Sequence, residues 1–176
     1  MAFLMREGKM ASNVLDSMLA NAKAEKDIKD GSLIVLGDIV TDTVYADQEY
    51  DTYKGDYPAA ATDEVVIADY AGISSGDIAG NNYRVGNKLY DLTIKAGEIF
   101  RVRRLALHDK FWLGADNFVG SPAVGQYAVA TAGAGEHTVQ ASIADSGYCV
   151  KIIASKGLTA GMQDAGMIYL CEVVKL

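Results

Sequence analysis

The chain has 176 residues, of which 50% are hydrophobic and 22% are charged, so it can bury a core and is not a disordered chain. Its formal net charge of −7 repels phosphate groups, which excludes nucleic acid as a main partner. No apolar run approaches the roughly 20 residues that a membrane-spanning helix needs, and the charges of Arg6 and Glu7 stand where a signal peptide would be apolar. We therefore expect a globular protein with no membrane partner.

The first predicted segment is an N-terminal arm with a short helix, residues 1–30. Ser12 is placed to cap a helix whose apolar residues recur every three to four positions, among them Val14 and Met18. Such a stripe has to be buried, either on the protein's own core or, as an arm, on a neighbouring subunit. The candidate partner-binding residues of this segment are Phe3, Leu4, Met5, Val14 and Met18.

Residues 31–176 are predicted to form a β-rich body, because β-branched runs alternate there with glycine-bearing turns. About nine short strands after one weak helix are typical of a β-barrel or β-sandwich. The run 137–144 alternates, so one of its faces meets the core, whereas 167–174 is apolar on both faces and is either central or part of an interface. The expected strands span residues 32–40, 43–46, 64–68, 99–107, 110–113, 126–131, 137–144, 148–154 and 167–174.

Two long connections, residues 47–63 and 71–98, are expected to carry contacts rather than core. The carboxylates of the first are Asp47, Glu49, Asp51 and Asp56. They are of the type that binds calcium, but the spacing lacks the glycine and glutamate of an EF-hand loop, so a solvated acidic loop is favoured. The neighbouring tyrosines suit either a protein interface or ordinary loop anchors; they are Tyr45, Tyr50, Tyr53 and Tyr57.

Neither histidine is expected to be catalytic. Adjacent residues on a strand face opposite sides, so we interpret His108 and Asp109 as a turn rather than as a catalytic pair. The glycines before His137 resemble the start of a phosphate-binding loop, but an alternating strand follows them instead of a helix, which favours a hairpin turn. We predict no catalytic residue and no cofactor.

No metal site is predicted either. The two cysteines and two histidines do not have the spacing of zinc ligands. Cys149 and Cys171 lie in hydrophobic strand-like runs and are expected to be buried free thiols.

Residues 99–113 combine three arginines with the only tryptophan of the chain. The strand period points Arg101 and Arg103 outward, and a bulge near Arg104 would restore the register of the apolar residues after it. Outward arginines either pair with the protein's own carboxylates or meet a carboxylate of a partner. Trp112 is either a core anchor or the centre of a contact. Arg101, Arg103 and Trp112 join the candidate partner-binding residues.

Three segments occur in the order and rough spacing seen in one family of phage proteins: DIKDGSLIVLG at 27–37, TDEVVIAD at 62–69 and KAGEIFRV at 95–102. The chain resembles the auxiliary head, or decoration, proteins of tailed bacteriophages over about residues 25–135. The segments KFWLG at 110–114 and GQYAV at 125–129 look like later barrel strands of that family. The resemblance implies a β-rich body on the outer capsid surface, with the major capsid protein as partner, a possible homo-oligomer, and no catalytic residues.

We therefore expect a non-enzymatic virion structural protein, made in the cytoplasm of the host bacterium, that binds the capsid surface and stabilises it. Many copies bound to one shell would give a large total stabilisation from contacts that are individually weak. The alternative is a phage tail or fibre component, or a glycan-binding β-sandwich. A single tryptophan argues against a broad aromatic platform for sugars, although tyrosines can take its place.

Overall fold

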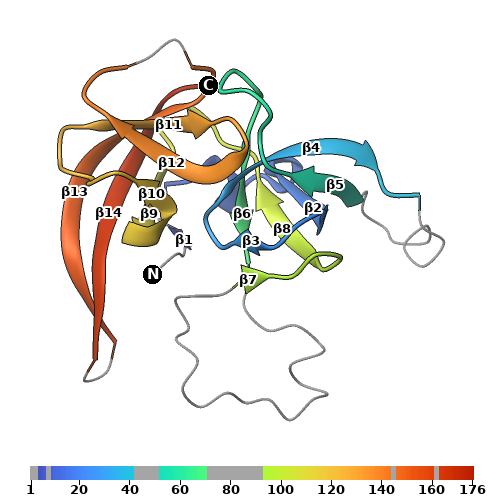
Figure 1. The fold of residues 1–176 in the computed structure, drawn as a ribbon, viewed down its shortest axis with the longest axis horizontal. Helices are drawn as coiled ribbons and strands as arrows, with labels where there is room; N and C mark the ends of the chain where they lie inside the picture. Colours follow the sequence, from blue (N-terminus) through green and yellow to red (C-terminus); the bar gives the residue numbers. More distant parts are fainter. Residues whose placement is uncertain (1–3, 7–8, 42–51, 71–92, 144–145, 161–162) are drawn as a thin grey trace.

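The computed structural model of this protein describes residues 4–6, 9–41, 52–70, 93–143, 146–160 and 163–176. The fold is mainly β, as the sequence predicts (Figure 1). The strands form a closed five-stranded barrel, a seven-stranded sheet and a two-stranded sheet.

The barrel runs in the order β2, β5, β4, β6 and β8. Its strands are β2 (Leu19–Ala24), β5 (Thr52–Asp56), β4 (Leu33–Ile39), β6 (Val66–Asp69) and β8 (Ile99–Arg103). All pairs are antiparallel except β2 with β5. Small residues let the strands close: a Cβ built on Gly55 would lie 3.1 Å from the Cβ of Ala22 inside the barrel.

The barrel has its own core, which includes Ile34, Phe100 and Val102. The short strands β3 (Ile28–Lys29) and β7 (Thr93–Ile94) pair with each other and add Ile28 and Ile94 to this core. The barrel interior is thus filled by side chains.

The seven-stranded sheet has the order β1, β9, β14, β13, β11, β12 and β10. Its strands are β1 (Leu4–Arg6), β9 (Lys110–Gly114), β14 (Gln163–Lys175), β13 (Cys149–Ala160), β11 (Tyr127–Thr131), β12 (Ala134–Gln140) and β10 (Phe118–Val119). Three short 3-10 turns complete the described elements: η1 (Ala11–Asn13), η2 (Asp16–Met18) and η3 (Ala115–Asn117).

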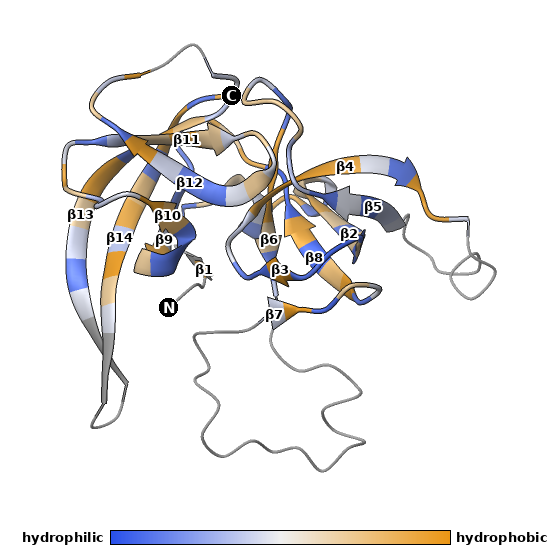
Figure 2. Cartoon of the chain, in the orientation of Figure 1, coloured by the Kyte–Doolittle hydropathy of each residue, from blue (hydrophilic) through white to orange (hydrophobic). Residues whose placement is uncertain are grey.

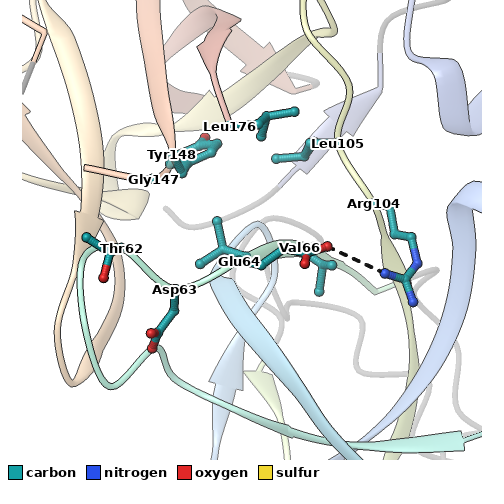
Figure 3. A pocket seen from close by; sticks show the side chains of 10 residues that line it. Thr62, Asp63, Glu64, Val66, Arg104, Leu105, Gly147, Tyr148 and Leu176 are labelled. Carbon is teal, nitrogen blue, oxygen red and sulfur yellow. Dashed lines mark ion pairs between the residues drawn. The ribbon is translucent and has the colours of Figure 1, made fainter. Parts of the chain in front are cut away.

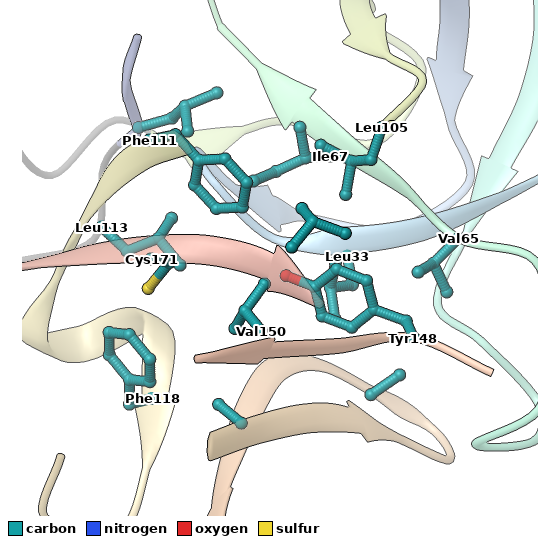
Figure 4. Close-up of a cluster of buried hydrophobic side chains, with 14 of the residues drawn as sticks. Leu33, Val65, Ile67, Leu105, Phe111, Leu113, Phe118, Tyr148, Val150 and Cys171 are labelled. Atoms are coloured by element: carbon teal, nitrogen blue, oxygen red, sulfur yellow. The ribbon is translucent and has the colours of Figure 1, made fainter. Parts of the chain in front are cut away.

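A second core joins the barrel to the sheet. Leu33 and Ile67 point out of the barrel and pack against residues of the sheet such as Phe111 and Val150 (Figure 4). Both are fully buried, so β4 and β6 carry apolar side chains on both faces where they pack against the sheet. Barrel and sheet therefore share one continuous packed body.

Strands β13 and β14 continue past the sheet as a two-stranded ribbon (Figure 1). The last residue pairs with the neighbouring strands are Lys151 with Tyr127 and Ile168 with Gly114, whereas β13 and β14 pair with each other as far as Ala160. In Figure 2, β13 passes from hydrophobic colours beside the sheet to a hydrophilic stretch on the ribbon. Both strands are longer than the sequence predicts.

The helix predicted to follow Ser12 does not form. Residues 11–18 make two 3-10 turns, and residues 19–24 are β2, which pairs with β8 and β5. The alanines that favour a helix instead fill the narrow barrel interior, so tertiary packing overrides helix propensity. The described strands of residues 1–30 belong to all three sheets: β2 to the barrel, β1 to the seven-stranded sheet through its pairing with β9, and β3 to the two-stranded sheet.

Other boundaries shift for local reasons. Strand β8 ends at Arg103 rather than at residue 107, although the N–H of Arg104 still donates to the carbonyl of Met18; the predicted bulge does not form in this strand. Strand β12 covers 134–140 rather than 137–144, and β5 lies inside the expected loop 47–63. The strand predicted at 43–46 lies outside the described residues.

Candidate interaction surface

His108 and Asp109 form a turn, as predicted. His108 has a φ of 71°, and the N–H of Asp109 donates to the carbonyl of Ala106. The buried carboxylate of Asp109 accepts the N–H groups of Ala106 at 2.9 Å and Ala11 at 2.7 Å. Asp109 therefore ties this turn to η1, and its oxygens are occupied by structural hydrogen bonds.

His137 lies on the hairpin that the sequence predicts, with its side chain fully buried in the sheet. Its Nε2 lies 3.2 Å from the carbonyl of Gly31, and its Nδ1 lies 3.2 Å from the hydroxyl of Tyr148. Burial lowers the pKa of His137 to about 4, so the ring is neutral at pH 7. Nε2–H then donates to Gly31, and Nδ1 accepts the Tyr148 proton. The histidine joins the barrel to the sheet.

Asp30 holds the N-terminal strand in place. Its buried carboxylate accepts the N–H of Leu4 and the N–H of Tyr70, each at 2.9 Å. Burial raises the pKa of Asp30 to about 6, and these hydrogen bonds offset part of that rise. The Asp30 carboxylate thus connects β1, the residue after β6 and the residues before β4.

Arg103 is buried rather than outward and free, which corrects the prediction for this residue. The strand period is right, since Arg103 does leave the barrel, but η1 covers it. Its Nε lies 2.6 Å from Asp69 Oδ2, and its Nη1 donates to the carbonyl and hydroxyl oxygens of Ser12 and to Asn13 Oδ1 at 3.0–3.1 Å. The guanidinium therefore fixes the N-terminal turns to the barrel wall.

The turn between η1 and η2 presents two large apolar side chains to solvent. Val14 is 80% exposed and Leu15 is 53% exposed. The backbone beneath them is held by Arg103, by Asp109, and by hydrogen bonds from Val14 N–H and Leu15 N–H to the carbonyl of Ala11. We call residues Val14 and Leu15 the apolar turn. Two adjacent exposed apolar side chains on a backbone held in this way make a candidate contact.

The other predicted residues of the N-terminal segment differ in their accessibility. Leu4 is buried in the core between barrel and sheet, so its side chain does not face a partner, contrary to the prediction. Met18 is half-buried. Met5 lies in β1 opposite Trp112, and Phe3 lies outside the described residues.

Trp112 is 7% exposed, which excludes it as the open centre of a contact. It faces away from the shared core, because its neighbours Phe111 and Leu113 are the ones that enter that core. The ammonium of Lys156, on the ribbon, lies 4.2 Å from the centroid of its ring. Trp112 therefore anchors the base of the ribbon to β9.

A pocket of about 410 Å³ lies between the barrel and the end of the sheet (Figure 3). A second pocket of about 290 Å³ adjoins it on the barrel side, where Val35 and Tyr53 are among its lining residues. Arg104 and Glu64 stand between them, with Nη1 3.8 Å from Oε1. Asp63 accepts the N–H groups of Ala59 and Ala60 and so closes its own turn. The described residues that line the larger pocket include Thr62, Glu64 and Tyr148, and none of them is a histidine or cysteine.

Within the described ranges, no three His, Cys, Asp or Glu side chains come together as a metal-binding group. Cys149 and Cys171 are buried free thiols, as predicted, and burial raises the pKa of both. Among the same residues no helix is long and apolar enough to cross a membrane. Comparison of the chain with protein-family models, curated proteins and solved structures finds no match.

The sequence pattern singles out Val14 but not Leu15 as a contact residue, because it assumes a helix. In a helix the two side chains point about 100° apart, whereas a 3-10 turn followed by extended backbone exposes both. The acidic Asp16 directly after them and the absence of a second capping residue were the available signals for a turn.

Proposed function

We propose that this chain is a non-enzymatic virion structural protein that binds the outer surface of a tailed-phage capsid and stabilises the shell. The apolar turn is the observation that carries the proposal. Val14 and Leu15 are exposed on a backbone held by a buried arginine, so docking them costs little conformational freedom. A contact of this kind is small, and repetition over a shell makes it effective.

The shape of the protein supports the same function. The β13–β14 ribbon projects from the body, and its edges past Lys151 and Ile168 have no partner strand among the described elements (Figure 1). Such ribbons suit contact with a large surface rather than enclosure of a small substrate. A protein with a net negative charge is also better suited to the outside of a particle than to its DNA-filled interior.

The glycan-binding alternative loses its main candidate group, since Trp112 is covered by Lys156 and offers no open aromatic face. The tail or fibre alternative is separated from the capsid proposal by the experiment below.

The test is rebinding to phage heads stripped of this protein, followed by sedimentation and by the melting temperature of the particles. We expect the unchanged protein to rebind and to raise the melting temperature. The double variant V14D/L15D should lose at least tenfold in affinity, because two carboxylates replace the apolar contact. Its matched control is V124D, which alters a valine that is 57% exposed elsewhere on the surface.

Absence of binding to heads, or binding to tails alone, would contradict the proposal. If V14D/L15D and V124D rebind equally well, the apolar turn is not part of the contact with the capsid.

A further inference from the structure

The larger pocket lies where barrel strands separate. The outermost pair of β6 and β8 at this end is Ile67 with Arg103, and residues 62–65 and 104–105 diverge beyond it. The described lining residues come from these two stretches and from the residues next to the ends of β13 and β14. We call this space of about 410 Å³ the junction pocket. Its volume is within the range of about 300–1,000 Å³ that is usual for ligand sites.

One end of the junction pocket is apolar. Val65, Leu105 and Tyr148 are buried and belong to the core that barrel and sheet share. Figure 3 shows Leu105, Tyr148 and Leu176 grouped together, and Leu176 is 51% exposed. An apolar group that enters this end would therefore contact a packed core and leave water.

The other end carries Arg104, whose charge is only weakly used within the protein (Figure 3). Among the described residues its guanidinium has one ion-pair partner, Glu64, and the distance of 3.8 Å from Nη1 to Oε1 is too long for a hydrogen bond. The Glu64 side chain is 89% exposed, so this pair contributes little stability and exchanges easily. The neighbouring Arg103 differs, because Asp69 and Ser12 enclose its guanidinium.

The backbone around the junction pocket is fixed by hydrogen bonds within the protein. The N–H of Arg104 donates to the carbonyl of Met18 at 2.8 Å, and the N–H of Gly147 donates to the carbonyl of Ala61 at 3.1 Å. The carboxylate of Asp63 accepts two N–H groups of the turn before it and is occupied there. A partner would therefore meet a site that is largely preformed, which lowers the cost of binding.

We propose that the junction pocket receives an apolar side chain of a partner protein, while a carboxylate close to it on the same segment pairs with Arg104 in place of Glu64. A planar guanidinium can hold a carboxylate through two parallel hydrogen bonds, which the contact with Glu64 does not provide. The net charge of −7 opposes an acidic segment only weakly, because charges further than about 8 Å away are screened at physiological salt.

A protein segment fits the junction pocket better than a free small molecule. The rim includes Glu64 and Leu176, which are both largely exposed, so a small molecule would remain partly in water. A protein surface would cover the rim as it inserts its side chain. The inference rests on the proposed function only for the identity of the partner, which would be a protein of the capsid surface.

The experiment uses the full chain and the capped peptide acetyl-Leu-Ala-Glu-Ala-Leu-amide, followed by backbone NMR shifts. In an extended segment its glutamate and both leucines face the same way, so either chain direction can place an apolar group beside the carboxylate. We expect shifts centred on residues 62–66, 104–105 and 147–148. The same peptide with glutamine in place of glutamate should bind about fivefold more weakly, as expected for one partly exposed ion pair.

Four variants at partly or largely exposed positions locate the contact. R104Q should bind the glutamate peptide only as well as the glutamine peptide, whereas R101Q, on β8 outside the pocket, should bind like the unchanged protein. E64Q should bind more tightly, because a competing carboxylate is gone. L176D should bind more weakly, since it places a charge at the apolar end, and V124D is its control elsewhere on the surface.

Equal binding of the glutamate and glutamine peptides, unchanged binding by R104Q, or no shifts in the unchanged protein would overturn the inference. Tighter binding of the peptide with lysine in place of glutamate would also overturn it, because the pocket would then select a cation. If the peptide binds as expected but stripped heads do not take up the protein, the proposed function fails and this inference stands. If heads take up the protein and the peptide does not bind, this inference fails and the proposed function stands.

Discussion

Arg103 Nε lies 2.6 Å from Asp69 Oδ2, and both side chains are buried where the N-terminal turns meet the barrel. Removing the cation would leave the carboxylate buried without this positive charge beside it. We expect R103M to lower the free energy of unfolding by about 3–5 kcal/mol, measured by urea denaturation. R101M, at an exposed position of the same strand, should change it by about 0.5 kcal/mol or less.

The same variant should loosen η1. Hydrogen exchange at residues 11–15 should accelerate in R103M relative to the barrel strands, since Nη1 is the donor to Ser12 and Asn13. Unchanged exchange there would show that Asp109 alone supports the apolar turn.

His137 makes stability depend on pH. Its pKa falls from 6.5 to about 4 on folding, so the neutral ring favours the folded state above pH 6.5, and this contribution is lost as the pH falls through about 4. Between pH 7 and 4 the loss amounts to about 3 kcal/mol. Asp30 acts oppositely: its folded pKa of about 6 exceeds 3.8, so its contribution is present below pH 3.8 and lost as the pH rises through 6.

The variant H137Q isolates the histidine, because Asp30 titrates in both proteins. The difference in unfolding free energy between the unchanged protein and H137Q should shrink as the pH is lowered from 7 to 4. A difference that is constant over this range would contradict a buried neutral His137.

Lys156 covers the only tryptophan of the chain, which gives a direct optical test. In K156A the indole of Trp112 should become more accessible to acrylamide, and its emission should shift to longer wavelength. The loss in stability should be small, about 0.5–1 kcal/mol. K151A, whose ammonium lies over Tyr127 instead, should leave tryptophan quenching unchanged.

Gly135 is a position where no side chain fits. A Cβ there would overlap the ring of Tyr57 and lie 2.9 Å from the Cβ of Ser32. We expect G135A to destabilise the protein by about 1–3 kcal/mol, since backbone and ring must both shift. In the control G157A the new methyl group meets nothing within 4 Å, so the midpoint of thermal unfolding should hardly move.

Predictions from the sequence succeed where the alternation of apolar and polar residues along a segment determines its structure. The runs that became β4, β9 and β11 are bounded by turns and alternate or stay apolar, so local pattern and final pairing agree. The turn at His108 and the hairpin before His137 follow from the same reasoning.

Predictions fail where a distant segment decides the structure. Residues 19–24 have helix-forming side chains, yet β8, some 80 positions away, recruits them into the barrel. The outward direction of Arg103 follows from the strand period, but its burial depends on η1 lying across it. The pairing of Lys23 with Lys54 has no signal in a single sequence, because parallel register is set by the closed barrel.

Closure of the barrel through β2 and β8 also sets when the protein can fold. The first barrel strand, Leu19–Ala24, cannot pair on its β8 side before Ile99–Arg103 has been synthesised. In the same way, β1 cannot pair before Lys110–Gly114 has been synthesised, and the other edge of that strand pairs with β14. The barrel is not complete until Arg103 has left the ribosome, and the seven-stranded sheet is not complete until nearly the whole chain has. Pairings this distant in sequence fold slowly and expose strand edges meanwhile. Truncation at the C-terminal hairpin should therefore yield aggregated chains rather than a shortened native protein.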